Sequence, residues 1–220
     1  MTASAAKSIA IALALALAIC APMVFSLSFS GMGNETFAAQ ATVMVSDDEG
    51  HGSGVVIARG LVLTAAHVVG TNPSMKITLS TGSQKIGHIL WTGRDHHDIA
   101  LIEVDTDAVT PARIDCRRLK MGGAVFTFGH PVNVRNVVTW GRIASDTVVD
   151  NDEAAVGSVL MDMTVLPGNS GGGVWESDGR LVGLADAVLA VPSGFGASLT
   201  GLSVMVSSPV LCLLLGRIAK

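Results

Sequence analysis

The stretch Leu166-Pro167-Gly168-Asn169-Ser170-Gly171-Gly172-Gly173 places one serine among glycines. Glycine permits a sharp turn and lets another backbone come close, so this setting is typical of an exposed nucleophile. Such a turn would direct the backbone N–H groups of Gly168 and Ser170, with Asn169 between them, toward one point as an oxyanion hole. Taken alone, the stretch fits an ordinary glycine-rich turn equally well. A serine nucleophile needs a base, so a histidine in a suitable context would favour the nucleophile over an ordinary turn.

All six histidines of the chain precede Ser170 in the sequence. Gly168-x-Ser170-x-Gly172 also fits the nucleophile elbow of the α/β-hydrolases, but those enzymes place their histidine after the serine. The order of the residues therefore excludes that class. His67 has the strongest context, because the apolar run Leu61–Thr64 leads into a short turn that ends at this imidazole.

An acid should orient the imidazole and stabilise its cation. Asp98 precedes the apolar run Ile99–Val104, which would hold its carboxylate at the rim of a buried strand. Asp95 is a local alternative without that anchor. Adjacent histidines in a loop rarely chelate one ion, so Asp95-His96-His97-Asp98 does not predict a metal site. We expect His67, Asp98 and Ser170 to act together.

Most of the chain after Ala41 consists of short, β-branched runs separated by turn residues. Their spacing of about 8–12 residues predicts an all-β barrel or sandwich. Two stretches, Ala65–Gly70 and Ser208–Ala219, look helical. The predicted strands are Thr42–Ser46, Gly54–Ala58, Leu61–Thr64, Met75–Leu79, Lys85–Thr92, Ile99–Val104, Ala124–Phe128, Val137–Ser145, Val159–Val165, Gly173–Glu176, Leu181–Ala187 and Leu202–Val206.

The N-terminal part of the chain carries an uncharged apolar run, Ile9–Phe29. It is long enough to form a helix across a bilayer, which needs about 20 residues. A cleaved signal peptide, with Thr36-Phe37-Ala38 as the cleavage site, and a retained signal anchor fit it equally well. Ser30–Gln40 would be a spacer. Because Lys7 marks the inner end, both alternatives place the rest of the chain outside the cytoplasm, either secreted or periplasmic, or anchored to the membrane through Ile9–Phe29.

Charge and cysteines limit the remaining options. The net charge is −4 and there is no basic run, so nucleic acid is not an expected partner. Of three cysteines, Cys20 lies in the N-terminal apolar run. We expect Cys116 and Cys212 to be buried free thiols, with pairing in an oxidising compartment as the alternative.

Three segments together resemble the signature segments of trypsin-like serine proteases. They are Thr64-Ala65-Ala66-His67, Asp98-Ile99-Ala100-Leu101 and Gly168-Asn169-Ser170-Gly171-Gly172, in the order found in that family. Pro167 and Asn169 make the last segment most similar to the bacterial HtrA (Deg) branch. The resemblance implies a chymotrypsin-like fold of two packed six-stranded antiparallel β-barrels, with His67 and Asp98 on the first and Ser170 with the oxyanion hole on the second.

The resemblance also implies a domain plan. A signal or anchor plus spacer would occupy residues 1–40 and the protease domain residues 41–220. Within the domain, barrel one would cover about 41–115, barrel two about 120–207, and a closing helix 208–219. HtrA enzymes usually carry PDZ modules after this domain. Because the chain ends at Lys220, we expect no PDZ-based peptide sensing.

The activity implied is that of a serine endopeptidase acting on exported proteins or peptides through an acyl-enzyme, without a cofactor. The alternative is an exported binding protein that keeps the fold but is catalytically silent or depends on a trigger. By its resemblance to the trypsin-like family, the chain would place Thr164 at the floor of the S1 pocket. Ala187, Val188 and Leu189 would line its wall. We therefore expect small or medium aliphatic P1 residues rather than Lys or Arg.

Overall fold

The computed structural model describes residues 33–93, 97–107, 109–145, 149–151, 154–193 and 196–218. The predicted N-terminal apolar helix, including Ile9–Phe29, lies outside the described residues, as do Asp95 and His96. Within the described part of the chain, no helix is both long and apolar enough to span a membrane.

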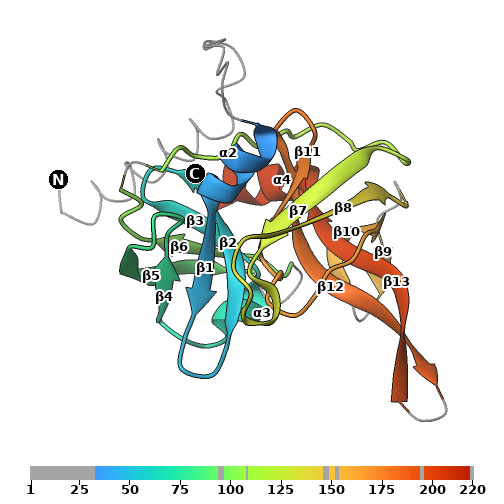
Figure 1. Ribbon diagram of the computed structural model, residues 1–220, viewed down its shortest axis with the longest axis horizontal. Helices are drawn as coiled ribbons and strands as arrows, with labels where there is room; N and C mark the ends of the chain where they lie inside the picture. The colour runs from blue at the N-terminus through green and yellow to red at the C-terminus, as the bar shows by residue number, and fades with distance from the viewer. Residues whose placement is uncertain are drawn as a thin grey trace.

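The first half of the described chain forms a closed six-stranded antiparallel barrel (Figure 1). Its strands are β1 (Thr42–Ser46), β2 (His51–Ala58), β3 (Leu61–Thr64), β4 (Ser74–Thr78), β5 (Gln84–Thr92) and β6 (Ala100–Glu103). They follow one another around the barrel in the order β1-β2-β3-β6-β5-β4. Valine, isoleucine and leucine side chains fill the interior, including Val43, Val45, Ile77 and Ile102. The alternation of strand residues is what directs these side chains inward.

The second half forms another closed antiparallel barrel. Its strands are β7 (Ala124–Gly129), β8 (Val137–Ile143), β9 (Val149–Asn151), β10 (Ala154–Asp162), β11 (Gly173–Glu176), β12 (Leu181–Ser193) and β13 (Gly196–Ser207). Six of them run in the order β13-β12-β11-β7-β8-β10, and pairing of β10 with β13 closes the ring, while β9 adds to the edge of β10. A short 3-10 helix, η1 (Pro131–Asn133), follows β7. The predicted all-β, two-barrel fold is confirmed.

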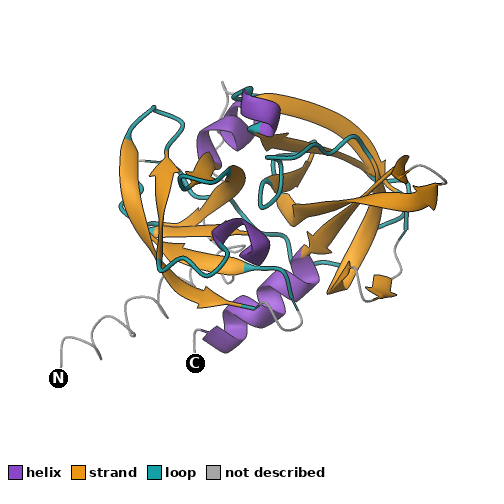
Figure 2. Cartoon of the chain, turned by 90° about the horizontal axis from the view of Figure 1, so that it is seen from below, coloured by secondary structure: helices purple, strands orange, loops and turns teal. Residues whose placement is uncertain are grey.

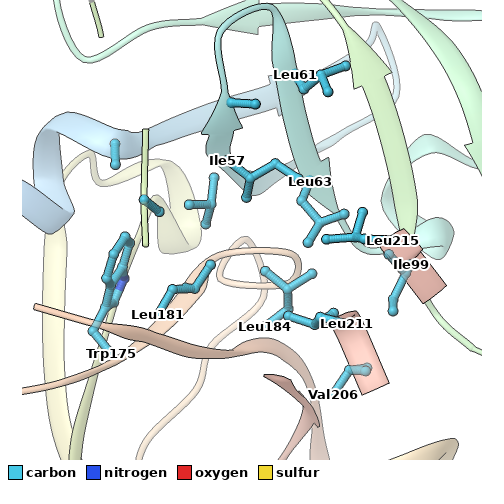
Figure 3. Close-up of a cluster of buried hydrophobic side chains, with 14 of the residues drawn as sticks. Ile57, Leu61, Leu63, Ile99, Trp175, Leu181, Leu184, Val206, Leu211 and Leu215 are labelled. Atoms are coloured by element: carbon cyan, nitrogen blue, oxygen red, sulfur yellow. The ribbon is translucent and has the colours of Figure 1, made fainter. Parts of the chain in front are cut away.

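A third apolar cluster fills the junction between the barrels (Figure 3). It combines Ile57 and Leu63 of the first barrel with Trp175 and Leu184 of the second. Helix α4 (Ser208–Ile218) lies along this junction, as Figure 2 shows, and Leu211 contributes to the same cluster. Each barrel therefore has its own core, and a shared core holds the two together.

The structure differs from the predicted spacer at Asn34–Ala41, which forms helix α2. Ala38 and Ala41 are fully buried in the shared core. Phe37 meets Trp175 edge to face, with 6.0 Å between the ring centroids. So short a helix is marginal alone, and this tertiary packing stabilises it. The predicted cleavage triplet Thr36-Phe37-Ala38 consequently lies inside a packed helix.

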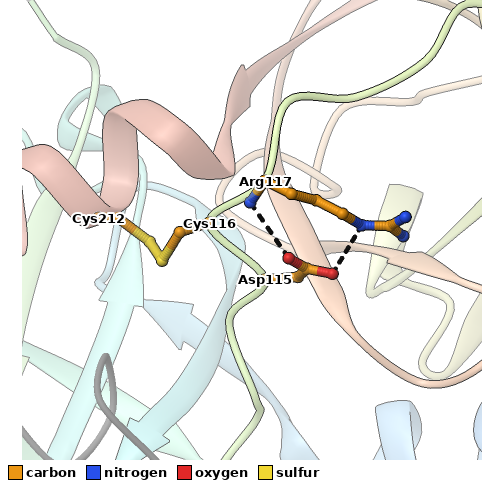
Figure 4. Close-up of a disulfide and its surroundings, with 4 residues drawn as sticks. All are labelled: Asp115, Cys116, Arg117 and Cys212. Carbon is orange, nitrogen blue, oxygen red and sulfur yellow. Dashed lines mark hydrogen bonds and ion pairs between the residues drawn. A yellow bond between two sulfur atoms is a disulfide. The ribbon is translucent and has the colours of Figure 1, made fainter. Parts of the chain in front are cut away.

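Cys116 and Cys212 form a disulfide (Figure 4), so the expectation of two free thiols is wrong. Their Cα atoms are 5.9 Å apart although 96 residues separate them in sequence. Cys116 lies in the connection between the barrels, and Cys212 lies on α4. Their proximity results from the return of the C-terminal helix to the junction, which sequence spacing does not reveal.

Candidate active site

His67 and Asp98 are brought together by the pairing of β3 with β6. Thr64 pairs with Ala100, so helix α3 (Ala66–Val69), which follows β3, meets the loop that precedes β6. The backbone N–H of His67 donates to Asp98 Oδ1 at 2.8 Å. Its ring Nδ1 is hydrogen-bonded to Asp98 Oδ2. These two bonds orient the imidazole, leaving Nε2 as the ring nitrogen available to act as a base.

The charges of His67 and Asp98 stabilise each other, so each group shifts the pKa of the other. The hydrogen bond to Asp98 raises the pKa of His67 above its ordinary value, against partial burial of the ring. Burial works against ionisation of Asp98, but hydrogen bonds with His67 and Asp186 hold the pKa of Asp98 below its usual range. Asp98 is therefore the carboxylate that stabilises a His67 cation.

Ser170 lies in the glycine-rich turn between β10 and β11. Gly168 has φ +99°, a left-handed conformation that glycine adopts without strain, and an added Cβ would lie 2.6 Å from the carbonyl oxygen of His130. The Ser170 hydroxyl donates to the backbone carbonyl oxygen of Asp186 at 3.0 Å. A cleft of about 580 Å³ is lined by His67, Gly168 and Ser170. It brings the predicted base and nucleophile to one surface.

The turn leaves two backbone donors available. Asn169 N–H donates to the carbonyl oxygen of Leu166 at 2.9 Å. Within the described residues, the N–H groups of Gly168 and Ser170 have no such acceptor. The amides of Gly168 and Ser170 can therefore bind an oxyanion, while Asn169 stabilises the turn between them.

Ser53 of β2 holds this turn from the opposite barrel. Its hydroxyl donates to Gly168 O at 2.7 Å and accepts from His130 N–H at 3.1 Å. Its backbone N–H donates to Ser170 O at 2.8 Å. The side chain is fully buried. Sequence reasoning missed Ser53, because nothing in the local pattern indicates contacts with Gly168 and Ser170, which lie more than 100 positions away.

A second unpredicted residue is Asp186 of β12. Its carboxyl is 8% exposed, and its Oδ1 is 3.9 Å from His67 Nδ1. Burial, together with a hydrogen bond to Asp98 and the charge of that group, raises the pKa of Asp186 to about 8. The side chain thus contacts the His67–Asp98 pair while the backbone carbonyl of the same residue holds Ser170. No motif in the sequence marks this acid.

The remaining histidines near the turn do not supply a better base. His130 is buried, and burial together with the charges of Arg135 and His51 lowers its pKa to about 4. His51 lines the cleft, and its Nε2 lies 2.9 Å from the carbonyl oxygen of His130. Both residues support the backbone beside the nucleophile.

The predicted specificity residues lie on two neighbouring segments. Thr164 is exposed, and its carbonyl oxygen accepts from the Thr139 hydroxyl at 2.8 Å. The preceding residue, Met163, accepts from Ser203 Oγ at 3.0 Å, and Ser203 pairs with Val188 across the β12–β13 ladder. Val188 is exposed, whereas Ala187 and Leu189 beside it are partly buried.

Two β-barrels with a histidine–aspartate pair on one and a serine in a glycine-rich turn on the other define the chymotrypsin-like class. The family model of the trypsin-like peptidase domain matches residues 52–184. The chain belongs to this family.

The relatives include a putative serine protease and a protein named HtrA-like, and the second name agrees with the predicted branch. The chain is 32% identical over 156 residues to HhoB of Synechocystis sp., covering 68% of this chain and 37% of HhoB. It is 31% identical over 160 residues to a serine protease HtrA-like protein of Staphylococcus aureus, covering 64% of this chain and 20% of that protein. The chain thus spans well under half the length of these two relatives.

Solved structures show the same fold. The HtrA-type protease AlgW with a tripeptide has a TM-score of 0.72 at 22% identity, covering 85% of this chain and 63% of that chain. The Rv3671c protease of M. tuberculosis, in its inactive form, has a TM-score of 0.71 at 17% identity, covering 83% and 91%.

Proposed function

We propose that this protein is a serine endopeptidase that hydrolyses peptide bonds in exported proteins through an acyl-enzyme intermediate. The observation that carries the proposal is one cleft lined by His67, which is oriented by Asp98, and by Ser170. The backbone N–H groups of Gly168 and Ser170, which have no acceptor among the described residues, would supply the oxyanion-binding donors that acyl transfer needs.

In the proposed reaction, Ser170 Oγ attacks the scissile carbonyl and passes its proton to His67 Nε2. Among the described residues, the resting hydroxyl donates to Asp186 O and not to His67, so this hydrogen bond must be exchanged for one to His67 before attack. Catalytic hydrogen bonds of this kind often form only when substrate binds. His67 then protonates the leaving amine, which leaves the acyl group on Ser170. Water, with His67 again as the base, attacks this ester, and the carboxylic acid product and free Ser170 are released.

The charge that develops on the substrate oxygen would be bound by the N–H groups of Gly168 and Ser170. Loss of one such donor typically lowers the rate by about 10²–10³. Every proton transfer is handled by Ser170 and His67, with Asp98 stabilising the cation. No step of this sequence requires a metal or another cofactor.

The Cys116–Cys212 disulfide supports an extracytoplasmic location, because disulfides persist mainly in oxidising compartments. The apolar run Ile9–Phe29 supports export as well, whether it is removed or retained. Substrates would therefore be exported proteins or peptides.

For specificity, we propose that Thr164 and the β12 segment at Ala187, Val188 and Leu189 form the S1 pocket. Their side chains are uncharged, so they offer no partner to a buried Lys or Arg. Cleavage after small or medium aliphatic residues is expected. A peptide-library profile dominated by cleavage after Lys or Arg would contradict this assignment.

Covalent labelling by a fluorophosphonate probe tests the proposed function. Wild-type protein should be labelled and should digest casein, and Ser170→Ala should do neither. Ser177→Ala is the matched control, because Ser177 is an exposed serine of the same barrel. An unlabelled wild type with a normal thermal unfolding transition would favour the alternative, a catalytically silent exported binding protein that keeps the fold.

A further inference from the structure

Asp186 is a buried acid in direct contact with the predicted catalytic pair. One oxygen of Asp98, one of Asp186 and a ring nitrogen of His67 all lie within 4.8 Å of one another. Among the described residues, the charged groups that act on the Asp186 carboxyl are Asp98, from the loop before β6, and His67 of α3. Asp186 comes from β12, so both barrels contribute to this group.

Two carboxyl groups this close, one of them buried, do not both ionise readily, because their charges repel and burial disfavours a second charge. Asp98 receives two hydrogen bonds from His67, one from the backbone and one from the ring, which favour its charged form. Asp186 has no comparable donor among the described residues, and its pKa is raised to about 8. The shared proton therefore belongs on Asp186.

We propose that Asp186 is a positioning residue that stays protonated at neutral pH and donates a hydrogen bond to the Asp98 carboxylate. This inference rests on the proposed function. The bond would hold Asp98 in the orientation that binds both the backbone and the ring of His67. It uses the buried side chain of a residue whose backbone carbonyl already holds the Ser170 hydroxyl.

The location of the proton decides whether the base is available. With one proton on Asp186 and one on His67 Nδ1, Nε2 is free to accept the proton of Ser170. If the Asp186 proton moved to Nε2, the cluster would hold the same number of protons, but the imidazolium could not act as a base. The three groups thus titrate as one coupled unit. The Asp186 proton itself remains in place through the cycle.

Deprotonation of Asp186 at alkaline pH removes the hydrogen bond to Asp98 and puts a second negative charge beside it. Asp98 is then repelled from the orientation that serves His67. Activity should therefore fall on the alkaline side with an apparent pKa of about 8, which is a property of the coupled group.

The test compares the pH dependence of kcat/KM of wild type, Asp186→Asn and Asp186→Ala on one peptide substrate between pH 5 and pH 10, with EDTA in all buffers to remove adventitious metal. Asn keeps a donor to Asp98 but cannot ionise, so the alkaline fall near pH 8 should be absent. At pH 7, Ala should lose about tenfold in kcat with KM little changed, as expected for loss of about 1.4 kcal/mol of orientation, and Asn should recover most of that loss.

Thermal unfolding at each pH would confirm that all three proteins are folded. An alkaline fall near pH 8 that persists unchanged in Asp186→Asn would overturn the inference, as would full activity of Asp186→Ala. Titration of the carboxyl groups by ¹³C NMR separates this inference from the proposed function. One outcome is a wild-type carboxyl that titrates near pH 8 and is absent in Asp186→Asn, in a protein that neither turns over substrate nor reacts with fluorophosphonate. That result would refute the proposed protease function and leave the inference about Asp186 standing. An Asp186 carboxyl that titrates near pH 4 would refute the inference whatever the activity.

Discussion

Removal of the disulfide should have a large and calculable effect on stability. Cys116 and Cys212 are separated by 96 residues, so the bond closes a loop that contains all the strands of the second barrel. The loop-entropy relation for a closed segment of this length gives about 4.7 kcal/mol of stabilisation at 25 °C. For a domain of this size, each kcal/mol changes Tm by about 2–4 °C. The Cys116→Ser/Cys212→Ser double variant should thus unfold roughly 10–20 °C lower.

The assay is urea unfolding followed by circular dichroism, with scanning calorimetry for Tm, on the oxidised wild type, the reduced wild type and the double variant. The last two should agree, because both lack only the covalent link. A thiol titration of unfolded, unreduced protein without the N-terminal segment that carries Cys20 should find no free thiol. Two free thiols, or a loss below about 1 kcal/mol on reduction, would refute the reasoning.

Two further predictions concern the buried residues that sequence reasoning missed. Ser53→Ala removes the acceptor of the His130 N–H and the donor to the Gly168 carbonyl, so we expect the free energy of unfolding to fall by about 1–3 kcal/mol and kcat to fall more than KM changes. Ser177→Ala is the control, and equal kinetics of the two variants would contradict the role of Ser53. Asp186 has a folded pKa of about 8 against 3.8 for the free group, so the folded state binds the extra proton and stability falls as pH rises through this interval, with the loss complete above about 8. Relative to wild type, Asp186→Asn should therefore gain Tm as the pH rises from 5 to about 8 and show a constant difference above that. A difference that stays constant from pH 5 to pH 8 would count against a buried proton.

The strands were predictable because they are short, β-branched apolar runs bounded by turn residues, and several of them are buried along nearly their whole length. Each predicted strand overlaps an observed one, and β1, β3 and β11 agree at both ends. The errors lie where packing and not pattern decides the structure. β12 and β13 continue past the predicted Ala187 and Leu202 as a long hairpin that projects from the barrel (Figure 1). β9 pairs only with the edge of β10, and helix α2 depends on the shared core.

The site was predictable only where chemistry imposes a local pattern. The glycines around Ser170 are a local requirement of the turn, because Gly168 has φ +99° and Gly171 has φ +80°, conformations that residues with a Cβ rarely adopt. Asp186 and Ser53 have no such requirement. Their roles follow from the register of β12 and from the approach of β2 to the second barrel, and both are tertiary facts. An acid within an otherwise apolar predicted strand, next to the last residue of Leu181–Ala187, was a signal that could have pointed to Asp186.

The geometry of the proposed catalytic triad depends on the junction between the barrels. His67 and Asp98 belong to the first barrel and Ser170 to the second, so their separation is set by whatever holds the barrels in register. Three features do this: the shared apolar core, the bonds of Ser53 to the nucleophile turn, and the disulfide that ties the inter-barrel connection to α4. A displacement of about 1 Å in a catalytic group can lower a rate about 10²-fold. Loosening this junction should therefore reduce kcat at temperatures at which each barrel is still folded.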